Sequence, residues 1–302
     1  MDSLTHGIAI GLLFFWIGMH ELILWGVVGA VILDFDVLFI VFSDSEPSLF
    51  IFSHGGVTHS IVGAVVVSVT AFLILRQFLT RTSIRRKIFP RFPELNTLIP
   101  EKIPFISVSG MVAGALLHLG LDCCASPGLP LLYPFSIQKF TLGMLPGSTM
   151  LLFLVSLAFI MFLIRGRITW RQVKVYSVIF LVILLFSAGM KGFVAINTEG
   201  RSIPTLNPFS WLIVKENGGV YTVDEYSVLQ GVTNRTVFEK YRNVTQADLE
   251  RYEDLPALER VQYFSYITIA ERSGDDIMFY DPLRKQQIIW YPPYYSSVRL
   301  SG

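Results

Sequence analysis

Charged residues and cysteines are scarce in this chain of 302 residues. Asp, Glu, Lys and Arg make up 16% of it, whereas an ordinary soluble domain contains roughly a quarter. The formal net charge of +1 lacks the basic excess that is typical of nucleic-acid-binding proteins, so we expect no nucleic-acid partner. Cys123 and Cys124 are the two cysteines, and neighbouring cysteines rarely bridge each other. These absences argue against a purely soluble protein and against a disulfide framework.

The charged residues that are present are unevenly distributed. Residues 191–302 hold 12 of the 24 Lys and Arg and 14 of the 23 Asp and Glu. The first 190 residues are therefore poor in charge, within a chain that is 52% hydrophobic. This division predicts two domains, a transmembrane domain over residues 1–190 and a water-exposed domain over residues 191–302.

Six apolar runs lie in the first 190 residues, and a bilayer span takes about 20 such residues. They are Gly7–Met19, Leu22–Phe42, Ser60–Leu75, Ile103–Leu121, Phe140–Ile164 and Val175–Met190. We predict a polytopic α-helical membrane protein with about six transmembrane helices, the first of them short. The opening stretch lacks a basic region, so we do not expect a cleavable signal peptide. Gly110 and Gly114 form a face of small residues, which predicts close helix packing.

Basic residues are concentrated in two of the predicted loops. The loops after the third and fifth helices contain eleven Lys and Arg, including the run Arg85–Lys87. The opposite loops, Ser43–His59 and Asp122–Thr149, contain only Lys139. Because basic loops stay in the cytoplasm, both chain ends are expected outside. We predict a multi-pass plasma-membrane protein with an extracytoplasmic C-terminal domain.

The C-terminal domain is predicted to be α+β, from two strand–turn–strand patterns and one capped helix. The strand pairs are Trp211–Val214 with Val220–Val223, and Tyr266–Ala270 with Ile277–Tyr280. Each pair encloses a turn that contains glycine, which is typical of a hairpin. Thr245 followed by Asp248 predicts the start of a helix that runs to about Phe264.

Eight ionisable side chains fall at one level of the predicted topology, near the outer ends of the helices. They are Asp2, His6, Asp34, Asp36, His54, His59, His118 and Asp122. Asp2 and His6 are four residues apart, as are His118 and Asp122, so each pair shares a helix face. Asp34 and Asp36 are two apart and cannot both face one site on a regular helix. Either one of them ligates and the other supports it, or the helix unwinds there.

A metal site explains this cluster better than scattered helix–helix hydrogen bonds or side chains that reach the interface. Unpaired ionisable groups in a membrane are costly, and imidazole and carboxylate are the ligands of zinc, manganese and iron. We predict a divalent metal, with zinc first and manganese or iron as alternatives. The predicted ligands are His6, Asp34, Asp36, His54, His59, His118 and Asp122. Asp2 either ligates the metal or orients His6.

Four motifs resemble the membrane-bound metal-dependent hydrolase family, whose namesake is the LexA-regulated protein YdjM. They are Met1-Asp2-Ser3-Leu4-Thr5-His6, Gly29–Asp36, His54-Gly55-Gly56-Val57-Thr58-His59-Ser60, and His118-Leu119-Gly120-Leu121-Asp122 with Leu131–Ser136. A looser match continues through Pro204–Trp211 and Tyr280–Arg284. This chain departs from the family pattern at three positions. Gly55 replaces the usual arginine, Leu33 the usual proline and Ala125 the usual threonine.

The resemblance implies a distant similarity to zinc-dependent phospholipase C and P1-type nuclease, helical enzymes that cleave phosphoesters with clustered metals. It thereby implies a metal-dependent hydrolase that cleaves an ester or phosphoester with a metal-activated water. Asp36 and Asp122 are the expected catalytic carboxylates, and Thr5 and Thr58 are expected to orient ligands. A site at the membrane surface favours a lipid or lipid-linked substrate. Gly55 in place of arginine bears on substrate binding more than on metal binding.

Two alternatives from other classes remain. In the first, the polar cluster is part of an ion or proton path through a transporter, although the third, fifth and sixth predicted helices contain no acid or histidine. In the second, the metal is structural and the protein is an interaction platform whose working part is the C-terminal domain. An open ligand position beside a pocket favours catalysis, whereas a closed coordination shell favours the structural role.

Overall fold

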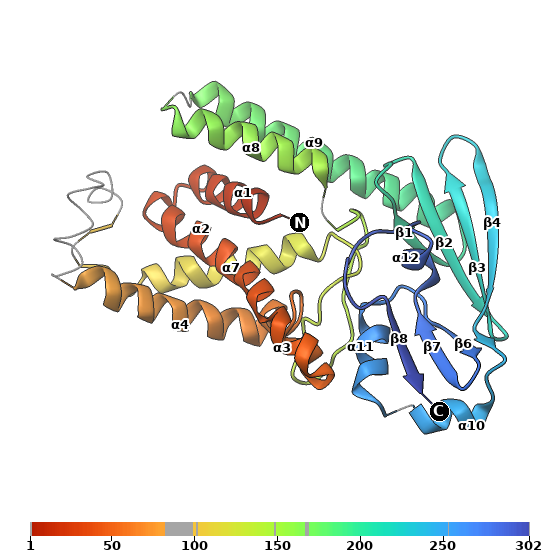
Figure 1. Cartoon of the computed structure of the whole chain (residues 1–302). Coiled ribbons are helices and arrows are strands. Elements are labelled where there is room, and N and C mark those ends of the chain that lie inside the picture. The colour runs from red at the N-terminus through yellow and green to blue at the C-terminus, as the bar shows by residue number, and fades with distance from the viewer. Residues whose placement is uncertain are drawn as a thin grey trace.

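The computed structural model describes residues 2–81, 99–100, 102–147, 149–166, 169–252 and 254–301. A helical part and a part built on two sheets lie at opposite ends of the molecule (Figure 1). The helices of the first part are α1 (Ser3–Trp16), α2 (Ile23–Ile32), α3 (Ile40–Ser45), α4 (Ile61–Thr80), α7 (Ser107–Asp122), α8 (Met150–Ile164) and α9 (Trp170–Asn197). Shorter 3-10 segments join them, namely η1 (His20–Leu22), η2 (Leu33–Phe39), η3 (Pro47–Phe52) and η4 (Val57–His59).

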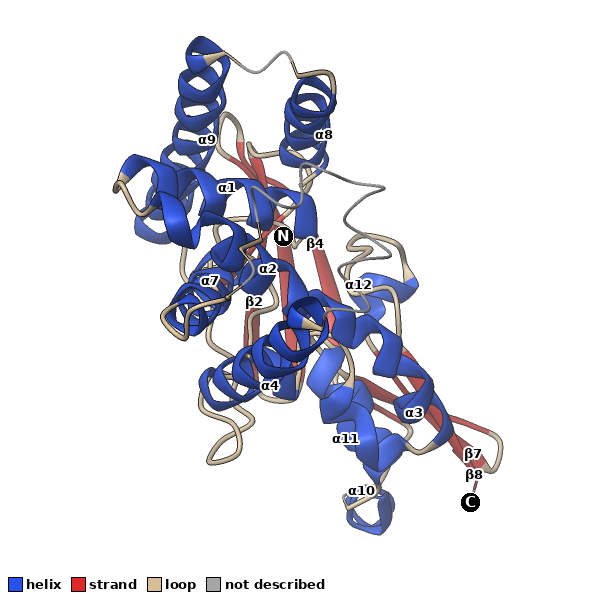
Figure 2. Ribbon diagram, turned by 90° about the vertical axis from the view of Figure 1, so that its left-hand side faces the viewer, coloured by secondary structure: helices blue, strands red, loops and turns tan. Residues whose placement is uncertain are grey.

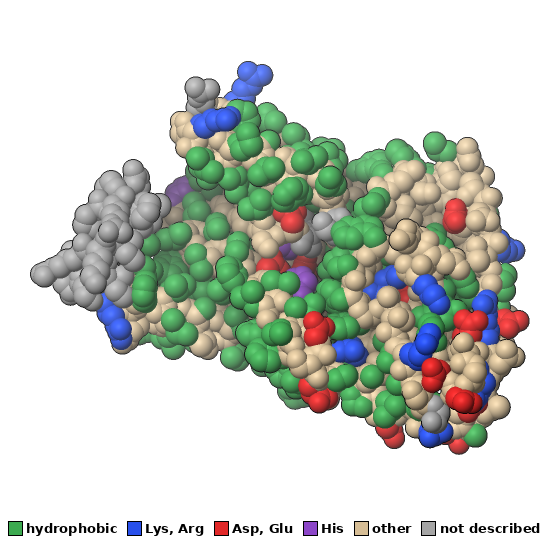
Figure 3. Space-filling model, in the orientation of Figure 1, with side chains coloured by type: hydrophobic (Ala, Val, Ile, Leu, Met, Phe, Trp, Pro, Cys, Tyr) green, Lys and Arg blue, Asp and Glu red, His purple; other side chains and the backbone are tan. Residues whose placement is uncertain are grey.

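Three helical segments are long and apolar enough to cross a membrane, namely His20–Ser45, Ile61–Thr80 and Trp170–Asn197. Helices α1, α7 and α8 are also apolar, but they have 14, 16 and 15 residues, fewer than a span usually takes. A helix therefore occurs within each of the six predicted runs, but α8 begins only at Met150, so the predicted start at Phe140 was ten residues too early. Six membrane crossings stay a prediction. Hydrophobic side chains cover the helical part, whereas charged ones gather over the sheets (Figure 3).

The ends of α4 and α8 that lead into the predicted basic loops both point away from the sheets (Figure 1). This arrangement agrees with loops on one side and the C-terminal part on the other. The basic run Arg85–Lys87 lies outside the described residues. The orientation of the chain in the membrane stays a prediction.

Helices α2 and α7 pack backbone to backbone. A Cβ added to Gly29 would lie 1.9 Å from the carbonyl oxygen of Met111, and one added to Gly114 would lie 2.0 Å from that of Gly26. Only glycine permits so close an approach. The close packing predicted from Gly110 and Gly114 is confirmed, and α2 is the partner.

The C-terminal part contains two four-stranded sheets that share a hydrophobic core. The first sheet has the antiparallel order β1 (Arg201–Pro204), β2 (Ser210–Asn217), β3 (Val220–Ser227) and β4 (Gly231–Glu239). The second has the order β5 (Tyr241–Arg242), β6 (Ile269–Ser273), β7 (Asp276–Tyr280) and β8 (Ser297–Ser301). Helices α10 (Gln246–Tyr252), α11 (Pro256–Phe264) and α12 (Pro282–Lys285) complete it. Seen from the helical end, the helices lie in front of the strands (Figure 2).

Both predicted hairpins are present. Asn217 pairs with Val220 around Gly218 and Gly219, whose φ angles of 57° and 81° suit a two-residue hairpin turn. In the second hairpin, β6 begins only at Ile269, so the predicted strand started three residues too early.

The single helix predicted from Thr245 to Phe264 is wrong, because α10 and α11 are separate. The predicted cap is present, since the Thr245 amide donates to Asp248 Oδ2 at 2.8 Å. The break comes at Pro256, which begins α11 and disfavours helical geometry in the residue before it. At the other end, α9 runs on to Asn197, close to the start of β1. The domain boundary at residue 190 stays a prediction.

Candidate metal centre

The seven predicted ligands meet at the junction between the helical part and the sheets. They come from α1, η2, the loop before α4 with η4, and the end of α7. The residues are His6, Asp34, Asp36, His54, His59, His118 and Asp122, and they form three groups that could each hold a metal ion. Acidic and histidine side chains are visible there in a hollow of the surface (Figure 3).

A change of helix type lets Asp34 and Asp36 serve the same site. On an α-helix, residues two apart point in directions about 160° apart, whereas on a 3-10 helix the angle is about 120°. Both residues lie in η2, where the chain continues α2 as a 3-10 helix. Both carboxylates consequently lie beside histidines of the cluster.

The first group joins α1 to the end of α7. His6 Nε2 lies 2.9 Å from Asp122 Oδ1, and His118 Nε2 lies 3.2 Å from Asp122 Oδ2. The rings of His6 and His118 stack with centroids 3.8 Å apart. The Asp122 carboxylate therefore contacts both buried, stacked imidazoles, one through each oxygen.

The other two groups extend the cluster toward η4. Asp34 Oδ1 lies 3.5 Å from His118 Nε2 and 3.6 Å from His59 Nε2. Asp36 lies 2.7 Å from His54 Nδ1 through one oxygen and 2.9 Å from His59 Nδ1 through the other. Since His59 and His118 each belong to two groups, the three groups form one continuous site.

The donor atoms fit a divalent transition metal. His118 Nδ1 lies 2.6 Å from the carbonyl oxygen of Ala30, to which it can only donate, so Nε2 keeps a lone pair directed at the cluster. Two buried atoms of the cluster, His6 Nδ1 and Asp34 Oδ2, have no hydrogen-bond partner in the described part of the chain. Buried polar atoms are seldom left unsatisfied, so a further group such as an ion suits this position. Imidazole nitrogen with carboxylate oxygen is the donor set of zinc, manganese and iron sites.

The three supporting residues predicted from the sequence act at different distances. Thr58 Oγ1 donates directly to Asp36 Oδ2. Asp2 accepts from the amide and the hydroxyl of Thr5 at 2.9 and 2.7 Å and caps α1. The Thr5 hydroxyl also contacts Ser156 Oγ of α8 at 2.9 Å. Thr58 thus touches a predicted ligand, whereas Asp2 and Thr5 position the helix that carries His6.

Nearly all of the helical part matches one known family. A model of the YdjM inner membrane protein family covers residues 1–193. The chain belongs to the YdjM inner membrane protein family. The match includes all seven His and Asp residues of the candidate metal site, and it agrees with the resemblance seen in the motifs. No curated protein and no solved structure matches the chain.

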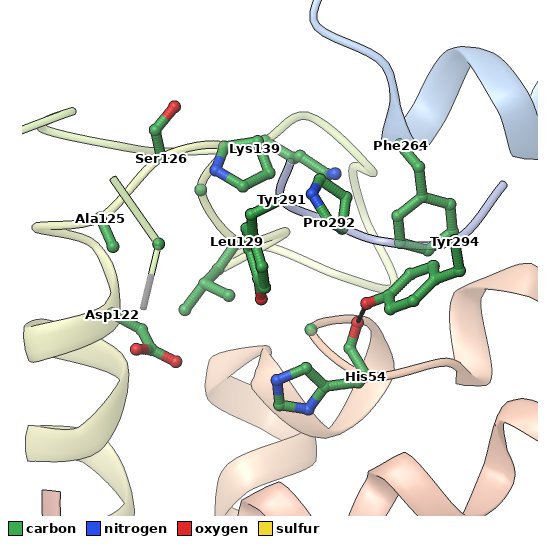
Figure 4. A pocket seen from close by; sticks show the side chains of 14 residues that line it. His54, Asp122, Ala125, Ser126, Leu129, Lys139, Phe264, Tyr291, Pro292 and Tyr294 are labelled. Atoms are coloured by element: carbon green, nitrogen blue, oxygen red, sulfur yellow. Dashed lines mark hydrogen bonds between the residues drawn. The ribbon is translucent and has the colours of Figure 1, made fainter. Parts of the chain in front are cut away.

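A small cavity of about 40 Å³ connects the YdjM-family region to the C-terminal part. His54 and Asp122 line it from the cluster, and Tyr291 and Tyr294 line it from the segment before β8. Tyr294 Oη donates to the carbonyl oxygen of His54 at 3.2 Å, and Tyr291 extends toward His54 and Asp122 (Figure 4). The cluster therefore opens toward residues that the family match does not include.

Three further residues of this site were not predicted from the sequence, namely Lys139, Tyr291 and Tyr294. Lys139 Nζ donates to the carbonyl oxygen of Tyr263 at 2.7 Å. Burial, with a smaller contribution from nearby Arg284, lowers the pKa of Lys139 to about 7. Two signals were present in the sequence, because Lys139 is the lone basic residue of the predicted outer loops and the tyrosines lie in an aromatic, proline-rich run.

Proposed function

We propose that this chain is a multi-pass membrane hydrolase that depends on one or more divalent metal ions, with zinc as the first candidate. It would cleave an ester or phosphoester in a lipid or lipid-linked substrate at the outer face of the membrane. The observation that carries the proposal is the continuous His/Asp site, in which His59 and His118 each join two potential metal groups. The adjoining cavity supports catalysis over a purely structural metal, because a substrate needs access to the site.

The two carboxylates predicted to be catalytic have different surroundings. A divalent ion held here supplies a Lewis acid and makes water acidic enough to act as a nucleophile near neutral pH. Asp122 lines the cavity and is 9% exposed, so we propose it as the base that takes the proton from the attacking water. Asp36 contacts His54 through one oxygen and His59 through the other, which favours a role in orienting these histidines.

A groove along the membrane-facing helices supports a lipid substrate. It has a volume of about 390 Å³, lies between α1, α2 and α8, and is almost entirely apolar. Ser3 lies at one end of it, one helical turn from His6. An acyl chain lying in this groove would bring its head group to the metal cluster.

The experiment that tests the proposal measures metal in the full chain purified in a maltoside detergent. Wild type is compared with His59→Ala and His118→Ala, and His20→Ala is the control because His20 is exposed and outside the cluster. We expect stoichiometric metal in wild type and control, loss of metal in both cluster variants, and hydrolysis of p-nitrophenyl phosphate or a short-chain phospholipid that follows the metal. Wild-type protein that binds no metal after reconstitution would overturn the proposal and leave a transport path or a packing network.

A further inference from the structure

A second and larger cavity adjoins the small one at the metal cluster. Its volume is about 510 Å³, within the range of small-molecule sites. The two cavities share Ser126, Pro127 and Lys139 in their walls. Its basic lining residues are Lys139, Lys191 and Arg201, and no acidic side chain lines it among the residues that the structure describes.

Within the described residues, the hydrogen bonds of these three cations all go to uncharged oxygens. Lys139 Nζ donates to the Tyr263 carbonyl at 2.7 Å, and its ammonium lies 3.8 Å from the centre of the Tyr263 ring. Lys191 Nζ donates to the carbonyl and the hydroxyl of Ser202 at 3.1 and 2.6 Å. Arg201 donates to a backbone carbonyl. Within the described residues, no ion pair joins any of these three to a carboxylate.

Several other cations of the C-terminal part form ion pairs with carboxylates. The pairs include Arg235 with Asp224, Lys240 with Glu216, and Arg272 with Asp248. The three cations of the cavity wall thus differ from these paired ones. A group of cations without carboxylates, two of them half-buried, is stabilised when an anion supplies the missing charge.

We propose that this cavity binds the anionic, phosphorylated head group of the substrate. The inference rests on the proposed hydrolase function, because it takes the scissile bond to lie at the metal cluster next to Lys139. Lys139 contacts the charge nearest the cluster, whereas Lys191 and Arg201, which line the larger cavity but not the small one, bind a second negative group. Ammonium groups bind phosphate as point charges, and a guanidinium adds a planar, bidentate contact.

Gly55 leaves space for this head group beside the cluster. Gly55 lines the small cavity with Lys139, and a Cβ there would meet only Leu129 at 3.9 Å among the described atoms. The space beside Gly55 is therefore open, and Lys139 supplies a positive charge from another part of the wall of the same small cavity.

The test measures anion binding separately from metal binding and turnover. The full chain in maltoside detergent is titrated calorimetrically with inorganic phosphate and with dihexanoyl phosphatidic acid, both with and without bound metal. The variants are Lys139→Met, Lys139→Arg and Lys191→Met, and Lys174→Met is the control because it lies on α9 but outside the cavity. We expect Lys139→Met and Lys191→Met to weaken Kd at least tenfold, while Lys139→Arg and the control stay within threefold of wild type.

The two ligands distinguish the two sources of a phosphorylated head group. Tighter binding of phosphatidic acid than of phosphate supports a lipid head group, and equal affinity for both supports a soluble phosphoester. Equal affinity of wild type and both Met variants for either ligand would overturn the inference, as would wild type that binds neither ligand. Metal content is measured in the same samples. Lysine-dependent binding of phosphate by protein without a metal site would support this cavity and contradict the proposed hydrolase.

Discussion

Replacing Gly29 with alanine tests whether contact between α2 and α7 positions the proposed metal ligands. α2 leads into η2 with Asp34, and α7 ends with His118 and Asp122. The new Cβ would lie 1.9 Å from the carbonyl oxygen of Met111, whereas real Cβ atoms essentially never come within 3.0 Å. Because the obstructing atom is backbone, the two helices must separate locally by about 1.1 Å.

This separation is large compared with the tolerance of a metal site. Asp34 Oδ1 and His118 Nε2 are 3.5 Å apart, one on each side of the moving contact. Ligand distances at a zinc site are held to within about 0.2 Å of their usual values. We therefore expect Gly29→Ala to weaken zinc affinity at least a hundredfold. Overpacking should also lower the free energy of unfolding by about 1–3 kcal/mol.

Zinc affinity is measured by competition with a chromophoric chelator, and stability by thermal unfolding in detergent. Gly120→Ala is the matched control, because Gly120 lies on α7, the helix that packs against Gly29, and its Cβ would meet no described atom within 4 Å. The control should keep zinc affinity and gain up to about 1 kcal/mol from helix propensity. If Gly29→Ala binds zinc like wild type, the α2–α7 contact does not position Asp34 and the argument is refuted.

Three further predictions follow from contacts of single side chains. Thr58→Val removes the hydroxyl that donates to Asp36 and should weaken metal affinity about tenfold, whereas Thr58→Ser should keep it; competition titration measures both. Burial near Tyr263 and Arg284 holds the pKa of Lys139 at about 7, and phosphate should bind its protonated form. Phosphate affinity measured from pH 6 to 9 should therefore fall above pH 7 in wild type and change less with pH in Lys139→Arg. Arg284 is buried 3.4 Å from Asp281 and donates to three backbone carbonyls, so Arg284→Met should cost about 3 kcal/mol in chemical denaturation. Arg299→Met, which removes an exposed cation, should change stability by less than about 0.5 kcal/mol, and an equal loss in both variants would contradict the role given to the buried pair.

Much of the helical part was predictable because its signals are local. A long apolar run and a rare charge within it are visible in the order of residues alone. The C-terminal part was less predictable where two local signals competed. Apolar residues continue through Pro256 with a helical pattern, yet the proline ended one helix and began another. At Tyr266, a residue with high strand propensity lies before the strand, where its amide donates to Asp281 instead of a neighbouring strand.

The sequence by itself determined the two-part organisation, the membrane family and the identity of the seven clustered histidines and aspartates. These follow from hydrophobicity, charge and spacing, which the chain carries before it folds. Only the tertiary structure decided which atoms meet: that Asp36 lies between His54 and His59, and that Tyr291 and Lys139 close the cavity beside Asp122. These contacts join segments far apart in the chain. Their distances depend on how closely backbones approach, as α2 and α7 do at their glycines, and residue order does not encode such distances directly.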